Sequence, residues 1–332
     1  MTAFFVNLLT WINGVVGNYG WSIVLFTLLI RIVLLPLDIK SKKSMRAMSK
    51  IQPKLQALQK KYANDKEKLN QKTMELYRKE HVSPTAGCLP MLISLPILWI
   101  MFSAMRTLGN EYTIKMLLDM KNTGSIPALQ SWLWIKNVFQ PDSFAATILP
   151  AVGSDLRMIT AVKSSAVLTA ENIEAVKLYL QSAEYSKLAA QLAPASAFNV
   201  QQIHFLFINS TLTIPNSIAN LFKYGNGLFI LPILAGASQF LMTKLMNGKQ
   251  TEEQKALQAE QQANQSNPMN SPVMKWFFPI FSVWICATSN AAFSIYWMAA
   301  NVIQIVQQMA VNWYFDRQDA KAAEQAAQNS DI

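Results

Sequence analysis

The sequence predicts an all-α, polytopic membrane protein with five transmembrane helices, a cytoplasmic helical hairpin and an extracytoplasmic insertion. Of its 332 residues, 52% are hydrophobic and only 14% are charged, whereas an ordinary soluble domain carries about 25% charged residues. The charged residues are also unevenly spread. Four long runs contain no Asp, Glu, Lys or Arg: residues 1–30, 82–105, 224–243 and 276–315.

These runs set the number of predicted spans, because a helix needs about 20 predominantly apolar residues to cross a bilayer. The first run holds one span after a short leading segment, the next two hold one each, and the last is long enough for two that turn at Asn290. Another uncharged run, 188–222, is rich in Pro, Asn and Gln, which argues against a sixth span. The predicted spans are 19–38, 87–106, 226–246, 273–289 and 291–313.

Residues 1–18 have apolar side chains at helical spacing with Asn and Thr between them. This pattern predicts a short interfacial helix on the outer face of the membrane. The segment has no basic leading region and no small-residue cleavage site, so we do not expect a cleaved signal peptide.

The charges of the loops predict the orientation. Residues 38–86 hold 13 Lys/Arg and 5 Asp/Glu, whereas residues 107–223 hold 8 Lys/Arg and 7 Asp/Glu. Cytoplasmic loops carry the excess of Lys and Arg, so the loop 39–86 is cytoplasmic and the insertion 107–225 is extracytoplasmic. The N-terminus is therefore outside, and the loop 247–272 and the tail 314–332 are inside. Much of the net charge of +10 belongs to the loop 39–86 rather than to a nucleic-acid-binding surface.

The loop 39–86 is expected to form a helical hairpin. Apolar residues at spacings of three and four between Met45 and Tyr62 predict a first helix, which Pro53 kinks or begins. The pair Asn64-Asp65 breaks the pattern and caps a second helix that runs to about Glu80. Two interpretations stay open: a basic hairpin attracted to anionic headgroups, or a platform that meets a polypeptide or a ribosome. In the insertion, residues 171–192 predict one helix.

Arg31 is the one charged residue well inside a predicted span. It follows Tyr19 by twelve residues, about 18 Å along a helix. A central Arg costs roughly 2.5 to 3.5 kcal/mol and usually faces a bundle interior or a wet cavity, although the side chain can also snorkel to the inner headgroups. No carboxylate lies well inside any span, so water or a visiting anionic group is the expected partner. The same absence argues against a proton- or cation-coupled transporter.

Weakly polar residues on the predicted spans suggest a hydrophilic groove around this arginine. Singly, such residues more often join helices than form a site, but together they favour a groove. The predicted substrate groove consists of Arg31, Thr27, Ser94, Gln239, Ser282, Tyr296, Asn301 and Gln304.

The sequence does not predict an enzyme. His81 and His204 lie on opposite sides of the predicted membrane, and Cys88 and Cys286 are likewise separated and are expected to be packing thiols. No metal-ligand spacing, nucleophile elbow or glycine-rich phosphate loop is present. We therefore expect no catalytic residue, no cofactor and no metal.

Four stretches resemble the YidC/Oxa/Alb family of membrane protein insertases. They are YGWSIVLFTLLIRIVLLPLDIKSKKSMRAMSKIQPKLQALQKKY (19–62), SPTAGCLPMLISLPIL (83–98), LPILAGASQFLM (231–242), and the segment 276–308 with FFPIF and SIYW. They cover all five predicted spans and the hairpin in order.

The resemblance implies a five-helix core in the bacterial cytoplasmic membrane, with a groove open to the cytoplasm and to lipid. Arg31 would hold the acidic or polar tail of a nascent membrane protein while its apolar segment moves into lipid. The hairpin would be a docking platform, the Sec translocon and the ribosome would be further partners, and no direct binding of nucleic acid is implied.

Three features depart from the family pattern. Ser94 stands where many members have Gln, the tail lacks a long basic extension, and about 85 residues follow Asp142 before the third span. This insertion is either a spacer or a contact for a partner. Two other functions stay open: an anion carrier or channel that uses Arg31, and a structural assembly factor without groove chemistry.

Overall fold

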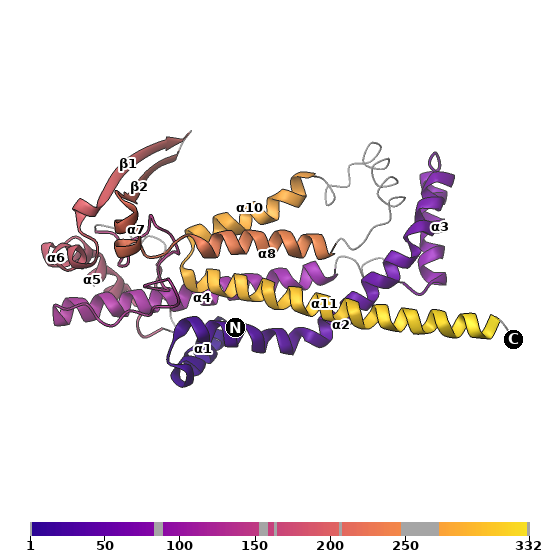
Figure 1. The fold of residues 1–332 in the computed structure, drawn as a ribbon, viewed down its shortest axis with the longest axis horizontal. Helices are drawn as coiled ribbons and strands as arrows, with labels where there is room; N and C mark the ends of the chain where they lie inside the picture. The colour runs from indigo at the N-terminus through magenta and orange to yellow at the C-terminus, as the bar shows by residue number, and fades with distance from the viewer. Residues whose placement is uncertain are drawn as a thin grey trace. The chain divides into compact units, whose positions relative to one another are not determined.

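The chain is mainly helical, as predicted, in a computed structural model that describes residues 2–82, 89–152, 159–162, 165–205, 208–246 and 272–330 (Figure 1). The helices are α1 Thr2–Val16, α2 Tyr19–Lys61, α3 Lys66–Lys79, α4 Leu89–Thr123, α5 Ala170–Leu180, α6 Ala183–Leu192, α7 Ile218–Tyr224, α8 Ile230–Met246, α10 Pro272–Thr288 and α11 Ala291–Ser330. The strands are β1 Phe198–Phe205 and β2 Ile208–Pro215.

Two compact units make up the fold. The first comprises Met1–Leu28 and Phe102–Ile332, and the second comprises Leu29–Met101. The division therefore passes through α2 and α4. We describe each unit by itself below.

The centre of the first unit is a helical bundle in which α8 packs against both α10 and α11 (Figure 1). Asn290, the predicted turn residue, lies between α10 and α11. Helices α8 and α10 approach closely at Gly236, where a Cβ atom would lie 2.5 Å from Val283 Cγ2. A small residue at this position thus permits the packing.

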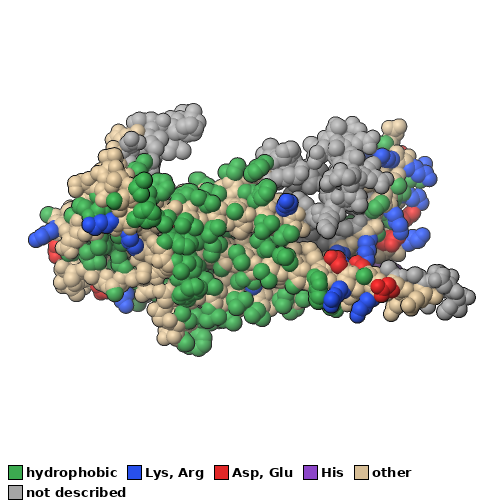
Figure 2. Space-filling model, in the orientation of Figure 1, with side chains coloured by type: hydrophobic (Ala, Val, Ile, Leu, Met, Phe, Trp, Pro, Cys, Tyr) green, Lys and Arg blue, Asp and Glu red, His purple; other side chains and the backbone are tan. Residues whose placement is uncertain are grey.

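Large apolar side chains cover the outside of this bundle. Figure 2 shows hydrophobic side chains gathered over α8, α10 and α11, with charged side chains toward the α5–α6 end and the C-terminal end of α11. On α10, for example, Ile280 is 63% exposed and Trp284 is 59% exposed. Soluble monomers rarely expose apolar patches of this extent, so the surface is that of a protein that contacts lipid or a large apolar partner.

Within the described part of the chain, one helical stretch, Tyr19–Met48, is both long and apolar enough to cross a membrane. Shorter apolar helices cover Thr2–Val16, Ile230–Leu245 and Trp276–Thr288. The five spans and their orientation stay predictions.

The helical hairpin of the second unit differs from the prediction at its start. Its first arm is the C-terminal part of α2, which continues through Pro36 and Pro53 without a break, so Pro53 does not begin a new helix. Each proline removes one backbone hydrogen bond, and the rest of the helix continues past it. The predicted cap of the second arm is confirmed, since Asp65 Oδ1 accepts a hydrogen bond of 3.0 Å from the backbone N–H of Lys68 at the start of α3.

The two arms of the hairpin are joined by an ion pair whose pH dependence can be tested. Lys54 Nζ donates to Glu80 Oε1 at 2.6 Å, and this hydrogen bond and the lysine charge lower the pKa of Glu80. The pair therefore stabilises the hairpin at pH values above the ordinary glutamate pKa of about 4.3. This contribution is lost as the pH falls through the lowered pKa of Glu80. We expect protease cleavage between α2 and α3 to accelerate slightly when the pH is below that pKa, and Glu80→Gln to accelerate it slightly already at neutral pH, because an exposed ion pair contributes little to stability.

Glu75→Gln is the matched control for this prediction. Glu75 pairs with Lys72 within α3 itself at 2.7 Å, so its loss should leave the link between the arms intact. Equal cleavage of the Glu80→Gln and wild-type proteins at neutral pH would show that the pair does not hold the hairpin.

The insertion contains a core of its own, built on an extension of α4. Helix α4 runs to Thr123, beyond the predicted end of the span at residue 106, and its side chains Ile114, Leu117 and Met120 pack with Val176, Leu180 and Tyr185 of α5 and α6. The prediction of one helix over 171–192 is wrong, because the chain breaks at Gln181–Ser182. Ser182 Oγ accepts a hydrogen bond from Tyr185 N at 3.1 Å and so caps α6 as a separate helix.

A β-hairpin is an element that the prediction of a mainly helical fold did not include. Strands β1 and β2 pair antiparallel, from Phe198 opposite Pro215 to Phe205 opposite Ile208. Their sequences, FNVQQIHF and INSTLTIP, contain Val, Ile and Thr, which favour strands. Figure 1 shows this hairpin with α5, α6 and α7 at the end of the bundle where α8 begins.

Candidate functional site

A partly buried polar pair links two helices of the bundle. Asn301 on α11 is largely buried, and its Nδ2 donates to Ser238 Oγ on α8 at 3.1 Å. Ser238 Oγ in turn donates to the carbonyl of Ala235 at 2.9 Å. Asn301 is one of the predicted groove residues, whereas Ser238 was not predicted. A small hydroxyl residue within an apolar helix is a known sign of helix–helix contact, and this signal was available in the sequence.

Two other predicted groove residues are satisfied within their own helices. Thr27 Oγ1 donates to Ile23 O at 2.6 Å, and Ser282 Oγ donates to Phe278 O at 2.8 Å. Both side chains are buried. Bonds of this kind, to the carbonyl four residues earlier, let a hydroxyl sit in an apolar helix, so these residues add little polarity to a groove.

The remaining groove residues lie on several helices. Tyr296 is buried on α11 with its ring centroid 6.3 Å from that of Phe293, and Gln239 on α8 and Gln304 on α11 are half-buried. The side chain of Ser94 on α4 lies outside the described residues. Arg31 belongs to the second unit, on α2 four residues after Thr27, and is half-buried. Its role as the groove arginine stays a prediction.

Sequence reasoning missed a carboxylate at the start of α8. Asp142 is fully buried, and its two oxygens accept hydrogen bonds from the backbone N–H groups of Leu228 (2.9 Å), Phe229 (3.2 Å) and Leu231 (2.7 Å). Trp134 Nε1 lies 3.3 Å from both carboxylate oxygens. These partners are more than 80 residues from Asp142 along the chain, except for Trp134, so no local motif marks them.

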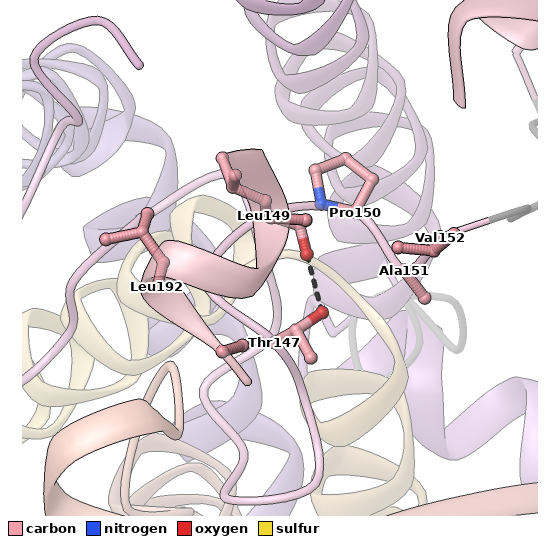
Figure 3. Close-up of a pocket in the computed structure, with 8 residues that line it drawn as sticks. Thr147, Leu149, Pro150, Ala151, Val152 and Leu192 are labelled. Atoms are coloured by element: carbon pink, nitrogen blue, oxygen red, sulfur yellow. Dashed lines mark hydrogen bonds between the residues drawn. The ribbon is translucent and has the colours of Figure 1, made fainter. Parts of the chain in front are cut away.

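The insertion has a small apolar cleft between residues 147–152 and the end of α6 (Figure 3). Its volume is about 60 Å³, whereas ligand pockets usually measure about 300 to 1,000 Å³. Figure 3 shows Thr147 turned toward the backbone of Leu149, to which its Oγ1 donates. The cleft is therefore a packing feature rather than a site for a small molecule. Across the described ranges, His, Cys, Asp and Glu form no group of three that could hold a metal ion.

A mainly helical chain with an apolar outer surface and a partly buried polar pair between its helices is typical of helical membrane proteins. The chain belongs to the family described as 60Kd inner membrane protein, whose model matches residues 11–182 and 175–318. This match confirms the resemblance seen in the sequence.

Several curated relatives carry the name membrane protein insertase YidC. The protein of Fusobacterium nucleatum is 45% identical over 141 residues, which are 42% of this chain and 60% of the relative. The protein of Bordetella pertussis is 42% identical over 112 residues, 32% of this chain and 20% of the relative. The protein of Polynucleobacter asymbioticus is 37% identical over 149 residues, 44% of this chain and 23% of the relative. The chain therefore matches less than two thirds of the length of each of these relatives.

Proposed function

We propose that this protein is a membrane protein insertase and chaperone. It receives nascent hydrophobic segments in a hydrophilic groove within the membrane and releases them into the bilayer, alone or with the Sec translocon. The observation that carries the proposal is the family match, which extends over both the bundle and the insertion. The relatives' name supports the same activity.

The physical basis of the proposal is the contrast between the inside and the outside of the bundle. The pair of buried Asn301 and half-buried Ser238 places polar groups among helices whose outer faces are apolar. A polar interior shortens the hydrocarbon path that a substrate's polar tail must cross. Burial of the substrate's apolar segment in lipid then drives the step at roughly 25 cal/mol per Å², so no nucleotide is required.

Arg31 supplies the attraction for the substrate in this proposal. At an effective dielectric constant near 20, opposite charges 4 Å apart attract by about 4 kcal/mol, which is strong enough to recruit an acidic tail and weak enough to release it. The hairpin of α2 and α3 would meet the nascent chain or the ribosome in the cytoplasm. The protein would lie in the bacterial cytoplasmic membrane with its N-terminus outside and its C-terminus inside.

The proposal predicts a charge-dependent insertion defect. In liposomes, Arg31→Glu should slow insertion of a short single-span substrate with an acidic tail by at least about tenfold, corresponding to a loss of at least about 1.4 kcal/mol. Arg31→Ala should be intermediate and Arg31→Lys mild, because Lys keeps the charge but loses the planar fork of donors. The measurement is protease protection of the substrate's tail inside the liposomes.

A substrate with a neutral tail is the control, and it should insert equally well with all four proteins. If Arg31→Glu equals the wild type on every substrate, the electrostatic mechanism is wrong. If substrate inserts equally well into protein-free liposomes, the insertase proposal fails. Anion flux into liposomes that depends on Arg31 would instead support a carrier or channel.

A further inference from the structure

One short loop holds the N-terminal ends of two different helices. Asp142 accepts three backbone N–H bonds at the start of α8, as described above. The carbonyl oxygens of Gln140 and Val138 accept the N–H groups of Ala291 (2.9 Å) and Ala292 (2.7 Å), which begin α11. The first N–H groups of a helix have no partner within it. Residues 138–142 accept those of Ala291 and Ala292 in α11 and that of Leu231 in α8, and Asp142 also accepts those of Leu228 and Phe229 just before α8 begins. The carboxylate also lies at the positive end of the α8 dipole.

Two buried asparagines fix this loop in place. Asn137 N donates to Asn226 Oδ1 at 2.9 Å, and Asn226 Nδ2 donates back to the carbonyls of Asn137 (3.0 Å) and Pro141 (2.8 Å). Asn137 Nδ2 donates to Ile148 O at 2.9 Å. Both asparagines are fully buried. A buried polar network with its groups satisfied rigidifies its surroundings, so the loop is a firm anchor rather than a flexible connection.

Each anchored end lies two to three helical turns from the polar pair of the bundle. Ser238 is eight residues after Ile230 and Asn301 is ten residues after Ala291, which is about 12 Å and 15 Å along the two helices. A shift of α8 by one residue along its axis would move Ser238 by about 1.5 Å and break its hydrogen bond to Asn301. The axial position of α8 therefore decides whether the pair forms.

We propose that Asn137, Asp142, Asn226 and the carbonyls of Val138 and Gln140 form a helix clamp that sets the register of α8 against α11. The clamp holds Ser238 against Asn301 and closes this end of the bundle to water. Asp142 is its positioning residue, because its carboxylate accepts the N–H of Leu231 in the first turn of α8 and those of Leu228 and Phe229 immediately before it. The proposal deepens the proposed function, since Asn301 belongs to the predicted groove.

The first test measures the register directly in the full chain, reconstituted in proteoliposomes. In a background with Cys88→Ala and Cys286→Ala, the pair Ser238→Cys and Asn301→Cys is oxidised, and the rate of disulfide formation is followed. Disulfides form only within narrow geometric limits. We expect rapid crosslinking with Asp142 present, a several-fold slower rate with Asp142→Asn, which keeps one acceptor oxygen, and a still slower rate with Asp142→Ala. Asp119→Asn, at an exposed position of α4, is the matched control and should crosslink at the original rate.

The second test measures closure. With only Asn301→Cys present, a membrane-impermeant maleimide added to the clamp side should not label the thiol, and Asp142→Asn should make it reactive. Labelling of the thiol from that side with Asp142 intact would overturn the proposal, and this arm does not require any Asp142 variant to fold. Unchanged crosslinking and labelling in folded Asp142→Asn protein would also overturn it, even if the melting temperature fell, because Asp142 would then be merely stabilising.

Neither test uses substrate insertion, so the two proposals can fail separately. A protein that inserts no substrate but protects the thiol until Asp142 is replaced would refute the insertase proposal and retain the clamp. A protein that inserts substrate but crosslinks at the same rate with and without Asp142 would refute the clamp and retain the insertase proposal.

Discussion

Tyr185→Ala should unfold the insertion while the bundle of α8, α10 and α11 stays folded. Tyr185 is fully buried, its ring packs edge-on against Tyr179 at 5.4 Å between centroids, and its hydroxyl donates to the carbonyl of Pro150 at 2.5 Å. Replacing a buried aromatic residue by Ala typically costs about 3 to 5 kcal/mol, and the whole stability of a domain is only about 5 to 15 kcal/mol. Limited proteolysis of the full-length protein should show rapid cleavage within residues 165–192 and slow cleavage of the bundle.

Two variants separate the contributions to this effect. Tyr185→Phe keeps the ring and removes the hydrogen bond, so it should cost only about 1 kcal/mol. Leu178→Ala changes a side chain on α5 that is 64% exposed and should leave cleavage unchanged. If Tyr185→Ala is cleaved no faster than the wild type, the core on the α4 extension is not what folds the insertion.

The pH dependence of this core follows from the same burial. Burial raises the pKa of Tyr185, and it also raises the pKa of Tyr179. The neutral phenols are therefore favoured in the folded state, so their contribution to stability is fully present below the ordinary tyrosine pKa of about 10. It is lost as the pH rises through the higher pKa values of the folded protein.

The features that the sequence predicts correctly are those decided by neighbouring residues. Asp65 caps α3 because its carboxylate reaches an amide three residues later, and Asn290 separates two helices within one apolar run. The mainly helical fold follows from long uncharged runs. Caps and turns can be predicted from the sequence because their interacting groups are only a few residues apart.

The features that the sequence leaves hidden depend on contacts across long stretches of chain. Asp142 is 86 to 89 residues from the backbone amides whose hydrogen bonds it accepts. Ser238 is 63 residues from Asn301 along the chain. The β-hairpin and the break at Ser182 were missed because helical periodicity in 171–192 and polarity in 188–222 do not reveal pairing or packing partners. The role of Arg31 stays a prediction, since it depends on a substrate that is not part of this chain.

The insertion is better explained as a folded domain than as an unstructured spacer. Its helices have side-chain caps at Thr169 and Ser182, and its core includes the end of α4. Within the first unit, the part of α4 from Phe102 to Thr123 runs into this core as one helix.

Gly236→Leu should strongly disrupt the packing of α8 against α10. A Cβ at this position would lie 2.5 Å from Val283 Cγ2 and 3.3 Å from the carbonyl of Pro279, and neither a β-branched side chain nor a backbone carbonyl yields easily. Overpacking typically costs about 1 to 3 kcal/mol, which we expect for Gly236→Ala, with Gly236→Leu at or above the upper end. Thermal unfolding in detergent gives the measurement.

A rescue variant and a matched glycine make this prediction specific. Val283→Ala combined with Gly236→Ala should recover most of the stability that Gly236→Ala loses, because it removes the methyl group that the new Cβ meets. Additive losses of stability in the double variant would contradict the close approach of α8 and α10. Gly14→Ala is the control, since a Cβ at Gly14 on α1 would have nothing within 4 Å. It should raise helix stability by up to about 1 kcal/mol. Since Ser238 lies two residues after Gly236, the Gly236 variants should also slow the Ser238→Cys/Asn301→Cys crosslink, whereas Gly14→Ala should not.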